Sequence, residues 1–146
     1  LAFLEVLNET DAVVGISGSQ YVSNGEVRKK MNKKKIVDVG YGQNLNYELI
    51  VKQNPELVMV YGVGSEVTGY THKLEELQIP VVMVAEYLEE SPLGKAEWIK
   101  FAGALFDKEK EANRFFKKVE QESSSPFATL ILLTSTIPCS SSNSVI

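Results

Sequence analysis

The sequence is poor in the two residue types that most often form covalent links and transition-metal sites. It has one cysteine, Cys139, and one histidine, His72, among 146 residues. A single cysteine cannot form a disulfide within the chain. A single histidine cannot supply a histidine-rich metal site. We therefore predict neither a bound metal nor another cofactor.

The sequence also lacks an excess of positive charge and a long apolar run. Its formal net charge is −4, which gives no reason to expect a nucleic acid partner. We interpret the basic run from Arg28 to Lys35 as a solvated turn. The sequence contains no run of about 18 apolar residues that could span a bilayer, and no signal peptide is visible. Because the opening LAFLEVLNETD is typical of the middle of an amphipathic helix, we expect the true amino terminus and any export signal to be missing.

Short apolar runs alternate with helical patterns along most of the sequence. Four runs predict strands: Ala12–Ile16, a run that ends at Gly40, Leu57–Tyr61, and a run that begins at Pro80. Helices are predicted over residues 1–7, 23–31, 44–54, 70–79 and 91–122. Strands that alternate with helices indicate βαβ units. The predicted fold is therefore α/β, with a parallel sheet flanked by helices.

Capping residues and apolar spacing add detail to these helices. Either Asn44 or Asn46 can cap the third helix, and Ser91 followed by Pro92 is a good start for the last one. We expect that last helical run to break near Asp107. The side chains predicted to face inward are Leu74 and Leu77, then Trp98, Phe101, Ala102 and Leu105, and finally Ala112, Phe115, Phe116 and Val119.

Candidate binding residues follow from the predicted topology, because ligands of an open α/β sheet bind beyond the carboxyl ends of its strands. Tyrosines recur at these ends, where each offers a flat ring with a polar tip, and glycines let the backbone approach a ligand closely. The candidates are Ser17, Gly18, Tyr21, Gly40, Tyr41, Gly42, Tyr61, Gly62, Val63, Gly64, Glu86 and Tyr87. Only two arginines occur, Arg28 and Arg114, and neither is expected at this edge.

Catalytic and phosphate-binding interpretations find less support. Gly62 and Gly64 begin a G-x-G turn, but Val67 stands where a dinucleotide motif needs glycine or alanine. His72 has no recognisable nucleophile beside it, and Glu86, Glu89 and Glu90 are explained as capping or surface charges. A Rossmann-like nucleotide-binding domain of an enzyme remains the alternative to a binding module.

Several segments together resemble a known family. These are FLEVLNETDAVVGISG, VDVGYGQNLNYELIVKQNPELVMVYG, KLEELQIPVVMVAEY and SPLGKAEWIKFAGALFDKEKEANRFFKKVEQE. They are similar to the N-terminal lobe of ABC-transporter substrate-binding proteins of the helical-hinge class, the class III periplasmic binding proteins. This class includes the vitamin B12 and ferric-siderophore binding proteins. The resemblance covers about residues 1–122.

The resemblance implies a two-lobed binding protein that is not an enzyme. Residues 1–122 would form the N-terminal ligand-binding lobe and the long helix that joins it to the second lobe. The serine-rich residues 123–146 would be a disordered tail or a truncated start of the second lobe. The ligand would be an iron chelate (siderophore or haem) or cobalamin, held by the strand-end residues named above.

The resemblance also implies a partner and a location. Glu48 matches the position of a glutamate that docks the lobe to an ABC-transporter permease. The protein would be a periplasmic or cell-envelope lipoprotein that contacts the membrane only through a missing lipid anchor or the permease. Three features depart from the family pattern: the first strand and export signal are absent, the second lobe is absent, and the tail does not continue the pattern. The zinc and manganese branch is disfavoured because its sites need several histidines.

Overall fold

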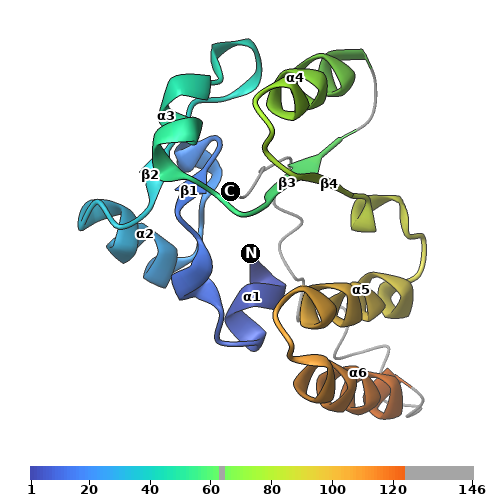
Figure 1. The fold of residues 1–146 in the computed structure, drawn as a ribbon. Coiled ribbons are helices and arrows are strands. Elements are labelled where there is room, and N and C mark those ends of the chain that lie inside the picture. Colours follow the sequence, from blue (N-terminus) through green and yellow to red (C-terminus); the bar gives the residue numbers. More distant parts are fainter. Residues whose placement is uncertain (63–64, 124–146) are drawn as a thin grey trace. The chain divides into compact units, whose positions relative to one another are not determined.

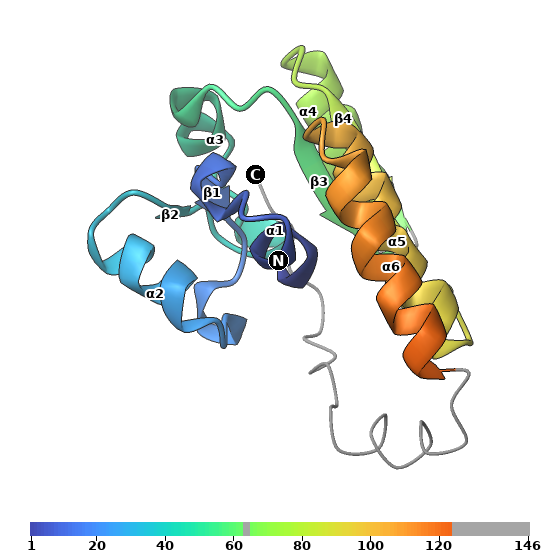
Figure 2. The ribbon, with the colours of Figure 1, turned by 90° about the horizontal axis from the view of Figure 1, so that it is seen from below.

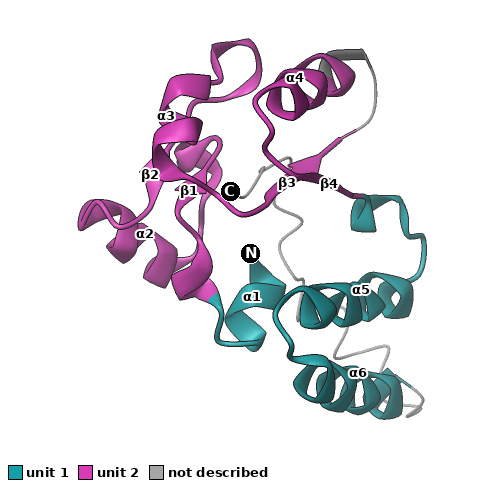
Figure 3. Cartoon of the chain, in the orientation of Figure 1, with its two compact units in different colours: residues 1–9, 85–139 teal, residues 10–84, 140–146 magenta. Residues whose placement is uncertain are grey.

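The computed structural model describes residues 1–62 and 65–123 of the chain (Figure 1). The described residues divide into two compact units, shown in different colours in Figure 3. One contains residues 10–62 and 65–84, which we call the sheet unit. The other contains residues 1–9 and 85–123, which we call the helical unit.

The sheet unit contains two pairs of parallel strands. Strand β1 (Gly15–Ile16) pairs with β2 (Val37–Asp38). Strand β3 (Val58–Tyr61) pairs with β4 (Val81–Val84) in a register that sets Val58 opposite Val81. The parallel direction predicted from the alternation of strands and helices is therefore confirmed.

Two of the three α-helices described in the sheet unit lie where the sequence predicts them. Helix α2 (Gly25–Asn32) is capped by Asn24, whose side chain accepts from the amides of Glu26 and Val27. Helix α3 (Tyr47–Gln53) is capped by Asn46, which resolves the choice between the two asparagines. Helix α4 spans Ser65–Glu76, so it begins five residues before the predicted range 70–79 and ends three residues before the end of that range.

A shared apolar core joins the strands and helices of the sheet unit. It combines side chains of β3 and of residues flanking β2 and β4 with side chains of α3 and α4. Its buried members are Val39, Ile50, Val58, Val60, Val67, Leu74 and Ile79. Burying apolar area of this kind is the main favourable contribution to folding. Leu77, predicted to face inward, is instead 38% exposed, because it lies after the last residue of α4, where helical spacing no longer applies.

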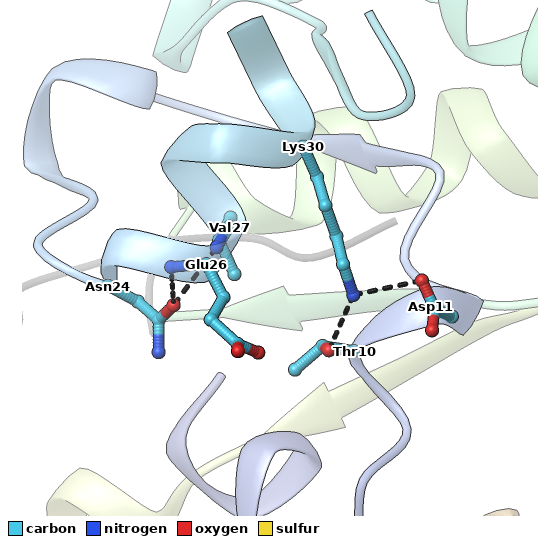
Figure 4. A network of polar contacts seen from close by, with 6 residues as sticks. All are labelled: Thr10, Asp11, Asn24, Glu26, Val27 and Lys30. Atoms are coloured by element: carbon cyan, nitrogen blue, oxygen red, sulfur yellow. Dashed lines mark hydrogen bonds and ion pairs between the residues drawn. The ribbon is translucent and has the colours of Figure 1, made fainter. Parts of the chain in front are cut away.

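The first predicted strand is shorter than expected. Residues Thr10–Ala12 form a 3-10 turn, so the prediction of a strand from Ala12 was wrong. The turn contacts α2 through Lys30, whose ammonium group donates to Thr10 Oγ1 at 2.6 Å and lies 3.0 Å from the carboxylate of Asp11 (Figure 4). Lys30 is only 19% exposed and lies within a helix, so the prediction of a solvated turn was wrong for this residue.

The helical unit is built around two long helices. It contains α1 (Ala2–Val6), α5 (Pro92–Leu105), α6 (Glu109–Ser123) and a 3-10 turn, η4 (Glu86–Leu88). Ser91 accepts from the amide of Gly94 at 2.9 Å and caps α5, as predicted. Figure 2 shows α5 and α6 side by side.

The predicted break near Asp107 is confirmed as the turn between α5 and α6. Asp107 has a φ of 54°, and the amide of Lys108 donates to the carbonyl of Gly103 at 2.7 Å. A side chain at Gly103 would meet the Cβ of Ala112 at 2.6 Å, so the two helices approach closely at this glycine.

The core of the helical unit lies between α1, α5 and α6. Its buried members are Leu7, Ala96, Ile99, Ala102, Ala112 and Phe116. Phe115 and Val119 pack against it, as their spacing predicts. Leu105 does not: it is 40% exposed because it is the last residue of α5, where the chain turns back toward α6. None of the described helices combines the length and apolar composition needed to cross a bilayer.

Candidate functional site

The loops that follow β1 and β2 are joined at the carboxyl edge of this strand pair. Ser17 is buried, and Gly18 has a φ of 72°. The amide of Gly18 donates to the carbonyl of Gly40 at 3.2 Å, which links the two loops through their backbones. Gly40 has a φ of 87°, and a Cβ there would lie 2.2 Å from the carbonyl oxygen of Asn44. Only glycine fits this position.

Asp38 makes a second link between the same loops. Its Oδ1 accepts from the amide of Gly40 at 2.9 Å, and its Oδ2 accepts from the amide of Ser19 at 3.2 Å. The sequence analysis did not select this residue. An aspartate two residues before a glycine is a signal for an Asx turn, which would have indicated the first bond. Nothing local in the sequence indicates the second bond, which joins positions 19 residues apart.

Tyr21 and Tyr41 lie next to each other at this edge. Their ring centroids are 5.6 Å apart, and the ring planes are tilted by 58°. The rings are not part of the core, since the two residues are 47% and 43% exposed. Gly42 follows with a φ of 56°, and no atom lies within 4 Å of the place a Cβ would take. The structure therefore brings together candidates from two strand ends, Tyr21 and Tyr41, into one exposed aromatic pair.

One arginine is bonded to the residue that follows Tyr21. Arg28 Nε donates to the carbonyl oxygen of Val22, the residue after Tyr21. This bond ties the side chain of Arg28, on α2, to the end of the loop that carries Tyr21. A guanidinium group can bind a carboxylate or another anionic group.

The end of β3 contributes Tyr61 and Gly62. Tyr61 is half-buried, and its carbonyl accepts from the hydroxyl of Tyr70 at 3.4 Å. Gly62 has a φ of 122°, and a Cβ there would lie 3.1 Å from Val67 Cγ2. Val63 and Gly64 lie outside the described residues, so the G-x-G turn stays a prediction.

The remaining two candidates, Glu86 and Tyr87, belong to the helical unit and not to the sheet unit. Both lie in η4 and are half-buried. Burial raises the pKa of the Glu86 carboxyl, and a backbone hydrogen bond and the positive charge of Lys95 oppose this rise only in part. A carboxyl group in this setting binds a proton more readily than one in water.

Glu48 is placed where a partner could reach it. It is exposed in the first turn of α3, where the partial positive charge of the helix terminus favours a carboxylate. It forms no ion pair with any residue of the described ranges 1–62 and 65–123. Its surroundings therefore leave the charge available at the surface.

Other chemically capable side chains have structural contacts. The side chain of His72 is 72% exposed on α4, as predicted, and its Nδ1 lies 3.4 Å from Glu76 of the next helical turn. Glu89 accepts from Trp98 Nε1 at 3.2 Å, so this carboxylate contacts α5. Within the part of the chain that the structure describes, no group of three or more histidine, cysteine, aspartate or glutamate side chains could hold a metal ion.

Comparison with known proteins identifies one family and three similar proteins. A family model for periplasmic binding proteins matches residues 1–125. Three proteins of Methanocaldococcus jannaschii are similar to the chain. An uncharacterized lipoprotein is 36% identical over 126 residues, which are 82% of this chain and 30% of that protein.

A second uncharacterized lipoprotein is 32% identical over 110 residues, or 73% of this chain and 28% of that protein. An uncharacterized protein is 32% identical over 92 residues, or 62% of this chain and 27% of that protein. The chain thus spans about three tenths of the length of these relatives.

Proposed function

Because the chain belongs to the periplasmic binding protein family, we propose that it binds a small molecule and helps deliver it to the permease of an ABC importer. It makes and breaks no covalent bond in this role. One structural observation carries the proposal: the exposed pair of Tyr21 and Tyr41 on two joined strand ends. Strand ends of parallel sheets are the usual ligand sites of α/β folds.

The proposed ligand is an iron chelate (siderophore or haem) or cobalamin. These ligands present large flat or ring-shaped surfaces, for which aromatic side chains are suitable partners. Arg28, whose side chain lies against the loop of Tyr21, could bind a carboxylate of such a ligand. The half-buried Tyr61 and Gly62 at the end of β3 are proposed as further contacts of the sheet unit. Glu86 and Tyr87 are proposed separately as ligand-binding candidates of the helical unit.

We propose that residues 1–122 act as one lobe of a two-lobed receptor at the cell envelope. The family match covers this range, and two of the similar proteins are named lipoproteins. One lobe buries only one face of a ligand. We therefore expect the chain by itself to bind more weakly than a two-lobed protein that encloses the ligand.

The test is a set of calorimetric titrations of the purified chain with haemin, cyanocobalamin, a ferric hydroxamate chelate and NADH. We expect saturable binding of one of the first three ligands and none of NADH. In the double variant Tyr21→Ala/Tyr41→Ala, that binding should weaken by at least about tenfold, the equivalent of losing one good aromatic contact.

The control is His72→Ala on α4, an exposed side chain whose only described polar contact is with the next helical turn. It should bind like the unmodified chain. Saturable binding of NADH alone would contradict the transport role and favour a nucleotide-binding domain.

A further inference from the structure

Asp38 connects the two loops that carry the exposed tyrosines. It is the last residue of β2, and its side chain is exposed, not buried in the core. One carboxylate oxygen accepts from Gly40 in its own loop at 2.9 Å. The other accepts from Ser19 in the loop after β1 at 3.2 Å. A carboxylate can serve two amides at once because each of its oxygens is an acceptor.

Each of these bonds ends within two residues of a tyrosine. Ser19 begins the 3-10 turn Ser19–Tyr21, and Gly40 directly precedes Tyr41. The carboxylate is therefore bonded to the backbone of both loops that carry the rings. The backbone bond from Gly18 to Gly40, at 3.2 Å, supports the same arrangement.

Burial of the rings themselves does not account for their position. Tyr21 and Tyr41 are 47% and 43% exposed, and yet their centroids lie only 5.6 Å apart. Two exposed rings on separate loops gain little from contact with each other, about 1 kcal/mol or less at the surface. The buried neighbours Val22 and Val39 anchor one end of each loop, and the hydrogen bonds between the loops are a further constraint on the spacing of the rings.

We propose that Asp38 is a positioning residue that holds the Tyr21–Tyr41 pair in its binding arrangement before a ligand arrives. The role in binding rests on the proposed function, because it assumes that the ligand contacts this pair. A site whose groups are already in place loses less conformational entropy on binding. Asp38 itself touches no ligand in this inference and acts through the two loops.

The experiment uses a graded pair of variants and a matched control. Asp38→Asn keeps one acceptor oxygen for the two amides, whereas Asp38→Ala keeps none. Asp11→Asn is the control: it makes the same chemical change in the same unit, at an exposed aspartate that pairs with Lys30 and not with the tyrosine loops.

The first measurement needs no ligand. Nuclear Overhauser contacts between the rings of Tyr21 and Tyr41 report their spacing, and single Tyr→Phe variants assign the signals. We expect the contact to weaken in Asp38→Asn, to be lost in Asp38→Ala and to persist in Asp11→Asn. The methyl signals of the buried core residues Ile16 and Val39 show whether each variant is folded. An unchanged ring contact in a folded Asp38→Ala variant would overturn the positioning role.

The second measurement is calorimetric titration with haemin. We expect about threefold weaker binding for Asp38→Asn, about tenfold weaker binding for Asp38→Ala and no change for Asp11→Asn, in line with one and two exposed hydrogen bonds. Equal affinity of the Asp38→Ala variant and the unmodified chain would contradict the inference. If the unmodified chain does not bind haemin, haemin is ruled out as the ligand of the proposed function, and the ring contacts alone decide the role of Asp38.

Discussion

Two glycines at the end of β2 illustrate how single residues shape this edge of the sheet unit. Gly40 and Gly42 both have positive φ values, of 87° and 56°. A Cβ at Gly40 would meet the backbone of Asn44 at 2.2 Å, whereas a Cβ at Gly42 would meet nothing within 4 Å. The first glycine is required by space as well as by backbone conformation, and the second by conformation alone.

This difference predicts that alanine at Gly40 destabilises the protein more than alanine at Gly42 does. Gly42→Ala should lower the free energy of unfolding by about 1 kcal/mol, the usual cost of a left-handed conformation for a residue with a side chain. Gly40→Ala should lower it by about 3 kcal/mol or more, because the loop must also move away from Asn44. Urea denaturation followed by circular dichroism measures both values. Equal effects of the two substitutions would contradict the steric role of Gly40.

At the scale of elements, helix α3 shows how one hydrogen bond selects where a helix begins. The sequence allows either Asn44 or Asn46 as the cap. The structure assigns the role to Asn46, whose side chain accepts from the amide of Leu49 at 2.9 Å. The backbone amide of Asn46 also donates to the carbonyl of Val39 at 2.8 Å, which ties the start of α3 to the end of β2. Asn44 lies instead in the 3-10 turn Gly42–Asn44.

The two asparagines therefore form a matched pair for mutation. Asn46→Ala should lower the free energy of unfolding by about 1 kcal/mol, because the first turn of α3 loses its capping acceptor. Asn44→Ala removes the same amide from an exposed position and should change stability by less than about 0.5 kcal/mol. Thermal or urea unfolding measures the stability of the two variants and shows which asparagine caps α3. A larger loss of unfolding free energy in Asn44→Ala than in Asn46→Ala would contradict the assignment of Asn46 as the cap.

At the scale of the whole molecule, the chain is a member of a family of binding proteins and presents an exposed acidic residue on α3. Glu48 and Glu26 occupy equivalent places, in the first turns of α3 and α2 and two residues after a capping asparagine. Both are exposed and belong to the sheet unit. The helix termini favour both carboxylates to a similar extent. If substitution of Glu48 and substitution of Glu26 affect partner binding differently, the difference would therefore not arise from helix stability.

The docking role proposed for Glu48 can be tested against this equivalent. If the proposed importer role holds, Glu48→Gln should weaken binding of the chain to the permease of that proposed importer by about fivefold, the equivalent of one exposed charge pair. Glu26→Gln should leave it unchanged, and the two variants should have similar stability. Surface plasmon resonance with the permease in lipid nanodiscs measures the affinities. Equal losses for both variants would contradict a specific role for Glu48.

Local patterns in the sequence were sufficient to predict much of the fold. The apolar runs locate all four described strands, their alternation with helices predicts the parallel direction, and the turn near Asp107 is found. Ser91 caps α5 as its position predicts, and Asn46 is one of the two caps that the sequence allows for α3. Each of these features depends on interactions between residues a few positions apart, and the sequence displays those directly.

Only the tertiary structure decided which distant residues meet. Lys30 contacts Thr10 and Asp11 at the turn before the first strand, while Asp38 contacts Ser19 and joins two loops. The pairing of Tyr21 with Tyr41 follows from these loops and from no pattern within either one. Periodicity reports which side of an element is apolar, but contacts between positions about 20 residues apart depend on how the elements pack, and packing is a property of the folded chain as a whole.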